Sequence, residues 1–172
     1  MPKKSVIIIN GCGGVGKDTL CNIASNHYDV LNISSITPIK EIAARCGWNG
    51  EKTNSARRFL SELKRIVTEY NDYPLTWLRE RYNEFVAGGD MIMFVHIREP
   101  HEIEKFKREI CSDALTILVR GGARMGGGGN YGNASDDLVE DYRYDYYYTN
   151  DKALSDIEED FIPFLDKIME RA

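Results

Sequence analysis

The residue types best suited to chemistry lie in one short segment near the start of the chain, residues 11–19, with the sequence GCGGVGKDT. Its spacing, G-x-x-x-x-G-K, is typical of a phosphate-binding P-loop, in which glycines let successive backbone N–H groups turn inward around a phosphate. Lys17 adds a full positive charge, and a helix beginning there would direct its positive dipole end at the same anion. The predicted nucleotide-binding residues are Gly11, Gly13, Gly14, Val15, Gly16, Lys17, Asp18 and Thr19.

The residue after Lys17 is a candidate ligand for a metal ion. A P-loop usually carries Ser or Thr at that position, and its hydroxyl binds the Mg²⁺ that accompanies the nucleotide. Here Asp18 occupies the position and Thr19 follows it. Both side chains offer the oxygen ligands that Mg²⁺ prefers, so the sequence leaves open which of the two reaches the metal.

A loop of this kind needs a strand before it and a helix after it, and the flanking sequence predicts both. Residues 5–10 (SVIIIN) form a β-branched apolar run, and residues 17–26 carry apolar side chains at helical spacing. Further strands are predicted at 28–33, 91–97, 114–119 and 144–148. Helices are predicted at 38–46, 54–70, 74–87, 100–110, 135–142 and 154–169, the last interrupted near Pro163. The alternation predicts an α/β, three-layer P-loop NTPase fold with a mostly parallel five-stranded sheet and helices on both faces.

Length and composition limit the remaining choices. The 172 residues, 42% hydrophobic and 28% charged, are typical of one globular domain, so we expect a single domain over residues 1–172. A net charge of −5 provides no broad positive field for nucleic acid. No apolar run is long enough for a membrane span or a secretory signal, so we expect a cytoplasmic protein without membrane contact. The four cysteines and three histidines show no metal-ligand spacing.

Glycine is concentrated in one later segment. Seven of the fifteen glycines lie in residues 120–132 (RGGARMGGGGNYG), a composition typical of a mobile loop. Two arginines, Arg120 and Arg124, accompany them. Three interpretations stay open: a lid over a nucleotide at about residues 120–134, a small Arg-Gly-Gly segment that binds RNA, and a loop without function.

Together these motifs resemble those of the phage-type deoxynucleoside monophosphate kinases, within the P-loop nucleotide kinase superfamily. The ending Gly-Lys-Asp-Thr carries most of the resemblance. Shorter similarities occur at residues 37–41 (TPIKE), 57–60 (RRFL), 96–102 (HIREPHE) and 150–151 (ND). His96 departs from the family pattern, which has aspartate at that position.

The resemblance implies an ATP- and Mg²⁺-dependent phosphotransferase that moves the γ-phosphoryl group to a small phosphorylated acceptor, with a deoxynucleoside monophosphate favoured. It implies that the glycine-rich segment is the lid, that Asn150 borders the adenine, and that Arg57 is better placed for the acceptor than Arg58. The implied catalytic residues are Lys17, Arg98, Arg120 and Arg124, and the implied acceptor-binding residues are Lys40, Arg57 and Arg98. Elementary chemistry agrees for Arg98, because an arginine at the carboxyl end of a central strand lies at the ligand-binding edge and its guanidinium fits a phosphate.

Other functions fit the same residues. The acceptor could be dephospho-coenzyme A or phosphomevalonate, or the chain could be a regulatory module that binds a nucleotide without transferring phosphate. The regulatory reading is favoured by His96, which replaces an acid; the histidine could also act as a base or simply be hydrogen-bonded at a strand end. Arg98 could instead pair with Glu102, and the helix residues Arg57 and Lys40 could face solvent. The sequence leaves the acceptor and the oligomeric state open.

Overall fold

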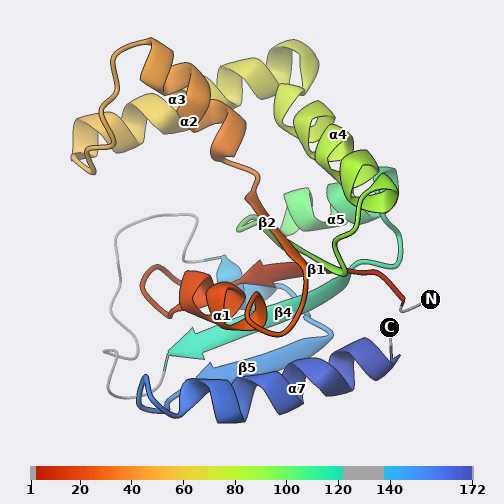
Figure 1. The fold of residues 1–172 in the computed structure, drawn as a ribbon. Helices are drawn as coiled ribbons and strands as arrows, with labels where there is room; N and C mark the ends of the chain where they lie inside the picture. The colour runs from red at the N-terminus through yellow and green to blue at the C-terminus, as the bar shows by residue number, and fades with distance from the viewer. Residues whose placement is uncertain (1–2, 122–137, 172) are drawn as a thin grey trace.

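The computed structural model describes residues 3–121 and 138–171 (Figure 1). A single five-stranded sheet has the order β2-β3-β1-β4-β5, and every neighbouring pair of strands is parallel. This confirms the predicted α/β class and the five-stranded parallel sheet. The strands are β1 (Ser5–Asn10), β2 (Val30–Ser34), β3 (Ile92–His96), β4 (Leu115–Gly121) and β5 (Tyr146–Asn150).

Helices cover both faces of the sheet and make three layers (Figure 1). One face packs against α1 and α7, and the other packs against α4 and α5. The helices α2 and α3 lie beyond the sheet, next to α4 (Figure 1). The helices are α1 (Lys17–Ala24), α2 (Thr37–Arg45), α3 (Asn54–Asn71), α4 (Tyr73–Ala87), α5 (Pro100–Glu109) and α7 (Ile157–Arg171), with a 3₁₀ turn η2 (Val139–Asp141).

The central strand β1 is buried along its whole length because side chains alternate between two covered faces. Ile7 and Ile9 pack toward α1 and α7, while Val6 and Ile8 pack toward the opposite helical layer. Each fully buried isoleucine contributes roughly 1.5–3 kcal/mol relative to an exposed one. The apolar run before the P-loop therefore fixes the strand from which the loop departs.

The C-terminal region departs from prediction in two places. Of the helix predicted at 135–142, residues 135–137 lie outside the described residues, and the rest forms only the 3₁₀ turn η2. The last helix is continuous from Ile157 to Arg171, so the predicted interruption at Pro163 was wrong. Pro163 is exposed, where water can satisfy the carbonyl that loses its N–H partner, and the buried residues Phe161 and Leu165 hold the helix on the sheet.

Because all five strands run the same way, their carboxyl ends meet at one edge of the sheet. The P-loop segment leaves β1 at this edge, and the segments that carry Arg98 and Asn150 lie there too. Open α/β sheets bind their ligands at this edge. Within residues 3–121 and 138–171, no helix has the length and apolar character needed to span a membrane.

Candidate active site

The first and last glycines of the P-loop segment, Gly11 and Gly16, are required by tight contacts with the neighbouring strands. Gly11 has φ +148°, and a Cβ there would lie 2.4 Å from the carbonyl oxygen of Val119 on β4. Gly16 has φ +91°, and a Cβ there would lie 2.6 Å from Nδ2 of Asn150. A side chain at either position would clash and would also strain the backbone. The loop is therefore seated directly on the ends of β4 and β5.

The helix that follows the loop starts without a side-chain cap. Gly16 is the N-cap residue of α1, in the left-handed conformation, and has no side chain to accept from the first-turn N–H groups. Those N–H groups are donors that helical geometry leaves without an intrahelical partner. An uncapped helix start beside a glycine turn is suited to an anion, and phosphate binding at this one stays a prediction.

Lys17 folds back over the loop. Its Nζ donates hydrogen bonds to the carbonyl oxygens of Gly11, at 2.5 Å, and Cys12, at 2.9 Å. These bonds hold the ammonium group beside the backbone turn that would surround a phosphate. A bound polyphosphate would attract the same ammonium group with a full negative charge.

Asn10 is a site residue that the sequence analysis treated only as the end of a strand. Its side chain is completely buried, and its Oδ1 accepts from the backbone N–H of Gly11 at 2.8 Å. Its Nδ2 donates to the carbonyl oxygen of Arg98 and to the hydroxyl of Tyr144, both at 2.9 Å. One amide therefore ties the P-loop to the Arg98 segment. A buried Asn at a strand end before glycine was the available signal.

Asn150 supports the loop from beneath. It is 1% exposed, and its Nδ2 donates to the carbonyl oxygen of Val15 at 2.9 Å. Within the described residues its Oδ1 has no hydrogen-bond partner. The sequence analysis assigned Asn150 to the border of the adenine; the structure places its side chain under the loop, and the adenine contact stays a prediction.

Replacing Asn150 by alanine is expected to loosen the loop. The change removes the bond to Val15 and is expected to lower the free energy of unfolding by about 1–2 kcal/mol, measured by urea denaturation. Nucleotide affinity, measured by calorimetry, is expected to fall about 10-fold because the loop must then be ordered on binding. The exposed Asn26 is the matched control, and equal effects of Asn26→Ala and Asn150→Ala would contradict the supporting role.

His96 lies under the start of α1 in a network of polar groups. Its Nε2 donates to Oδ1 of Asn32 at 2.8 Å and lies 3.7 Å from Sγ of Cys21. Burial lowers the pKa of His96, and the charges of Lys17 and Arg98 lower it further, against the opposing effect of Asp18. The imidazole is therefore neutral at pH 7. Its hydrogen bond to Asn32 agrees with the expectation of a histidine that is hydrogen-bonded at the end of a strand. Its use as a base stays a prediction.

The two candidate metal ligands lie in the first turn of α1. The Asp18 side chain is 90% exposed, and its Oδ1 is 3.8 Å from Nε2 of His96, too far for a hydrogen bond. Thr19 is half-buried. Carboxylate and hydroxyl oxygens are ligands suited to Mg²⁺, so the donors present here fit that ion.

Arg98 lies two residues after the end of β3 and is exposed. Its backbone is held through its carbonyl by Asn10, which fixes the position of the segment at the strand edge. The alternative partner considered for Arg98 was Glu102, and Oε1 of Glu102 instead accepts from Nζ of Lys64 at 2.7 Å. Lys64 comes from α3, so this ion pair joins two segments far apart in the sequence.

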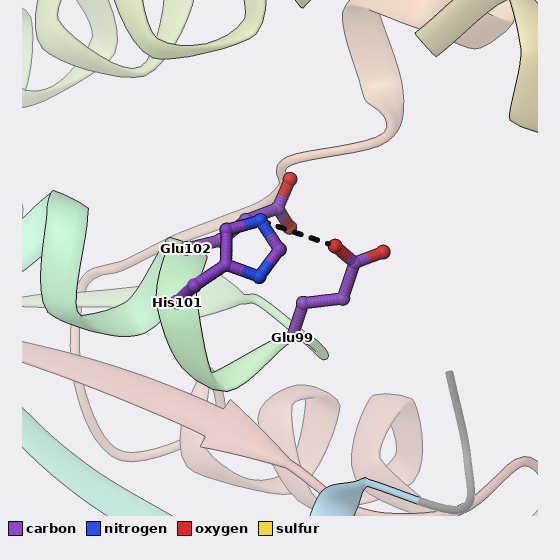
Figure 2. A group of neighbouring side chains, drawn as sticks. All are labelled: Glu99, His101 and Glu102. Carbon is purple, nitrogen blue, oxygen red and sulfur yellow. Dashed lines mark ion pairs between the residues drawn. The ribbon is translucent and has the colours of Figure 1, made fainter. Parts of the chain in front are cut away.

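Three side chains converge at the start of α5, namely Glu99, His101 and Glu102 (Figure 2). His101 Nε2 lies 3.4 Å from Oε2 of Glu99, and Lys64 Nζ lies 3.3 Å from Oε1 of the same residue. The donors could by type hold a metal ion. The ammonium of Lys64 already provides the positive charge that the two carboxylates need, so we interpret the group as an ion-pair cluster.

The ion pairs of Lys64 with Glu99 and Glu102 also show which side of α3 faces the start of α5. Arg57 and Lys64 are seven residues apart and share one side of the helix, separated by about 20°, whereas Arg58 lies about 100° further round than Arg57. Because Lys64 contacts the segment just after Arg98, Arg57 lies on the side of α3 that faces that segment. Arg57 is exposed, and its contact with an acceptor stays a prediction, as does that of Lys40, which is exposed on α2.

Replacing Lys64 by alanine is expected to destabilise the fold. Glu99 and Glu102, whose side chains are 30% and 20% exposed, would lose their cation. We expect the free energy of unfolding to fall by roughly 1–2 kcal/mol, between values for exposed and buried pairs, with recovery in Lys64→Arg. Arg108→Ala, which removes a 68% exposed arginine from α5, is the control in the same urea titration. A Lys64→Ala protein as stable as that control would rule out the bridging role.

The arginines of the predicted lid are placed only in part. Arg120 on β4 donates to both carboxylate oxygens of Glu140, at 3.0 and 2.7 Å, and its guanidinium lies 4.8 Å from the centre of the Tyr147 ring. Arg120 could neutralise a phosphate only after the phosphate had displaced the Glu140 carboxylate from the arginine. Arg124 and residues 122–134 of the predicted lid lie outside the described residues, and their roles stay predictions.

No protein-family model matches the chain, and no curated protein matches it in sequence. Its fold is similar to that of a sugar kinase from a Janibacter species, with a TM-score of 0.52 and 14% identity over 95% of each chain. It is also similar to a gluconokinase from Sinorhizobium meliloti, with a TM-score of 0.52 and 15% identity over 99% of this chain and 95% of that one. The fold is also similar to that of the tunicamycin resistance protein of Deinococcus radiodurans, with a TM-score of 0.53 and 14% identity over 95% of this chain and 96% of that one.

The fold is that of the P-loop kinases. Coverage is nearly complete in both directions for all three neighbours, so the likeness extends from the P-loop through the last helix. At 14–15% identity it concerns the fold alone. The chemistry must be argued from the residues at the strand edge.

Proposed function

We propose that the chain is an ATP-dependent phosphotransferase that moves the γ-phosphoryl group of ATP to a small phosphorylated acceptor. The observation that carries this proposal is the backbone turn over residues 11–16, seated on β4 and β5, together with the uncapped start of α1 and the Lys17 ammonium bonded to the turn. Backbone N–H groups, a helix dipole and a full positive charge together favour a polyphosphate over any neutral ligand.

On the donor side, the P-loop would hold the phosphates in one orientation, and Lys17 would neutralise charge on the β- and γ-phosphates. Asp18 and Thr19 would hold Mg²⁺, which when bound withdraws charge from the β- and γ-oxygens. The protein need not form a covalent intermediate. Positioning and charge stabilisation account for most catalysis in this reaction class.

On the acceptor side, Asn10 binds the backbone of Arg98 at the sheet edge, and Lys64 joins α3, the helix that carries Arg57, to the start of α5 just after Arg98. Two guanidinium groups suit an acceptor phosphate, because each can donate two parallel hydrogen bonds. A nucleoside monophosphate, and within that class a deoxynucleotide, is the favoured acceptor by the resemblance of the P-loop and the Arg98 segment. Dephospho-coenzyme A and phosphomevalonate fit the same description.

A second candidate is an acceptor that carries a hydroxyl group but no phosphate. Two neighbours in fold are a sugar kinase and a gluconokinase, and the neutral imidazole of His96 would be in the correct state to accept a hydroxyl proton. An acceptor phosphate needs no such base because it is already largely ionised at neutral pH.

The proposal is tested by acceptor-dependent ADP release from ATP and Mg²⁺. The acceptors are the nucleoside and deoxynucleoside monophosphates, dephospho-coenzyme A, phosphomevalonate, gluconate and simple sugars, each against a reaction without acceptor. We expect stimulation by a phosphorylated acceptor. Stimulation only by gluconate or a sugar would favour the second candidate, and nucleotide binding without any stimulated release would favour a regulatory module.

A further inference from the structure

Tyr144 lies two residues before β5 and is almost completely buried. Its hydroxyl makes two hydrogen bonds with residues that are far apart in the chain. It donates to the carbonyl oxygen of Val139 at 2.9 Å and accepts from Nδ2 of Asn10 at 2.9 Å. Val139 is the first residue of the turn η2, so the hydroxyl joins that turn to the end of β1.

The surroundings of the Tyr144 ring hold this hydroxyl in one place. The ring packs edge-on against Tyr142, with ring centres 5.0 Å apart, and against Tyr147, with centres 6.0 Å apart. The backbone N–H of Tyr144 donates to the Tyr147 hydroxyl at 3.2 Å. Burial raises the pKa of Tyr144 to about 12, so the hydroxyl keeps its proton at neutral pH. Tyr144 therefore presents a fixed hydroxyl that can donate one hydrogen bond and accept another.

The hydrogen bonds of this hydroxyl have a direction. A backbone carbonyl can only accept, so Val139 draws the Tyr144 proton toward itself and leaves the hydroxyl oxygen as an acceptor. An acceptor at this point selects the NH₂ end of the Asn10 amide rather than its oxygen. The Asn10 oxygen is then turned toward the N–H of Gly11, at 2.8 Å, and Nδ2 also donates to the carbonyl oxygen of Arg98, at 2.9 Å.

The opposite orientation of the Asn10 amide would be unfavourable at both ends. Its oxygen would face the carbonyl oxygen of Arg98, and its NH₂ group would face the N–H of Gly11. Both hydrogen bonds would be lost at a residue that has no solvent exposure. Gly11 begins the P-loop segment, and Arg98 is the proposed acceptor-binding arginine. The orientation of this one amide therefore sets the position of the P-loop relative to the Arg98 segment.

We propose that Tyr144 is a positioning residue for phosphoryl transfer, whose hydroxyl orients the Asn10 amide and thereby holds the P-loop and the Arg98 segment at the separation that the reaction needs. This inference rests on the proposed function. Tyr144 acts through Asn10 rather than by binding a substrate. Transfer between two bound molecules depends on their alignment, and a misplacement of about 1 Å can cost about 100-fold in rate.

The variant Tyr144→Phe removes the hydroxyl and keeps the ring. With saturating ATP and acceptor, kcat is expected to fall about 10-fold because donor and acceptor are less well aligned. ATP affinity, measured by calorimetry, is expected to stay within about 2-fold of the wild type, because the contacts of Gly11 and Gly16 with β4 and β5 are unchanged.

The matched control is Tyr148→Phe, which also removes the hydroxyl of a buried tyrosine. Tyr148 is 5% exposed, and its hydroxyl donates to Oδ2 of Asp160 at 2.9 Å on the face of the sheet that packs against α7. This variant is expected to keep the wild-type kcat. Equal kcat values in Tyr144→Phe and Tyr148→Phe would overturn the proposal.

A double-mutant cycle tests whether Tyr144 acts through Asn10. Asn10→Ala removes the amide, so the Tyr144 hydroxyl then has nothing to orient. In the Asn10→Ala background, Tyr144→Phe is expected to change kcat by less than about 2-fold, compared with about 10-fold in the wild type. The same 10-fold loss in both backgrounds would show that the hydroxyl acts independently of Asn10, which would also overturn the proposal.

Amide hydrogen exchange tests the inference without any reaction. The N–H of Gly11 is bonded to the Asn10 oxygen, so its exchange rate, measured by NMR, depends on the orientation of that amide. We expect exchange at Gly11 to be about 10-fold faster in Tyr144→Phe than in the wild type, and unchanged in Tyr148→Phe. Equal exchange in all three proteins would contradict the positioning role. A wild-type protein without acceptor-stimulated ADP release would instead contradict the proposed function, and the exchange rates would still show whether Tyr144 orients Asn10.

Discussion

Replacing Lys17 by alanine is expected to lower kcat for phosphoryl transfer about 10²- to 10³-fold, the loss typical of removing one charge-stabilising donor. Negative charge accumulates on the oxygens around the transferring group, and Lys17 is the full positive charge placed within the loop itself. The measurement is steady-state ADP release with saturating acceptor, together with calorimetry for ATP. ATP affinity is expected to fall as well, because the ammonium also neutralises ground-state charge.

The matched control for this change is Lys107→Ala. Lys107 lies near Asp145, at 3.9 Å, by the amino-terminal ends of β4 and β5, away from the P-loop. Lys107→Ala removes the same type of side chain and the same charge, so it shows any general effect of removing one lysine from the protein. If Lys17→Ala and Lys107→Ala retain equal turnover and ATP affinity, Lys17 does not contact the nucleotide.

Replacing Arg98 by alanine is expected to lower kcat/KM for the acceptor roughly 10²-fold while ATP affinity stays near its wild-type value. We expect this separation because the P-loop would hold the donor, whereas Arg98 lies just after the end of β3, the strand next to β1. Hydrogen bonds to charged groups contribute about 1.5–3 kcal/mol, which corresponds to this loss. Acceptor titrations at saturating ATP give the kinetic constants, and calorimetry gives the ATP affinity.

One further variant separates charge from geometry at position 98, and a second variant on α5 is the control. Arg98→Lys keeps the charge but not the planar fork, so it is expected to recover only part of the lost activity. Arg108→Ala removes a 68% exposed arginine on α5 and is expected to have no effect on acceptor use. Equal loss of ATP affinity and acceptor use in Arg98→Ala would move this residue out of the acceptor site.

The parts of the structure that were predictable from the sequence depend on local pattern. The β-branched run before the glycine turn predicts β1, and the turn itself predicts the helix that begins at Lys17. Both predictions depend only on residues that are neighbours in the sequence. The parallel direction of the strands followed from the alternation of strand and helix, whereas their order in the sheet was seen only in the structure. These features required no knowledge of which distant segments meet.

The side chains that hold the site together were not predictable in the same way. Asn10 acts through contacts with Arg98 and Tyr144, which are 88 and 134 residues away in the chain. Lys64 was part of a helical pattern, and only the fold shows that it reaches Glu99 and Glu102. The pairing of Arg120 with Glu140 likewise joins residues on either side of the glycine-rich segment. Each partnership depends on tertiary packing that one sequence does not encode locally.

The proposed function requires that the backbone turn over residues 11–16 and Lys17 hold the polyphosphate of ATP. A crystal structure with a non-hydrolysable ATP analogue and Mg²⁺ tests it most directly. We expect the β- and γ-phosphates inside this turn, with the Lys17 ammonium bonded to their oxygens. A structure in which the triphosphate lies elsewhere on the protein, with the turn empty and Lys17 still bonded to Gly11 and Cys12, would contradict it.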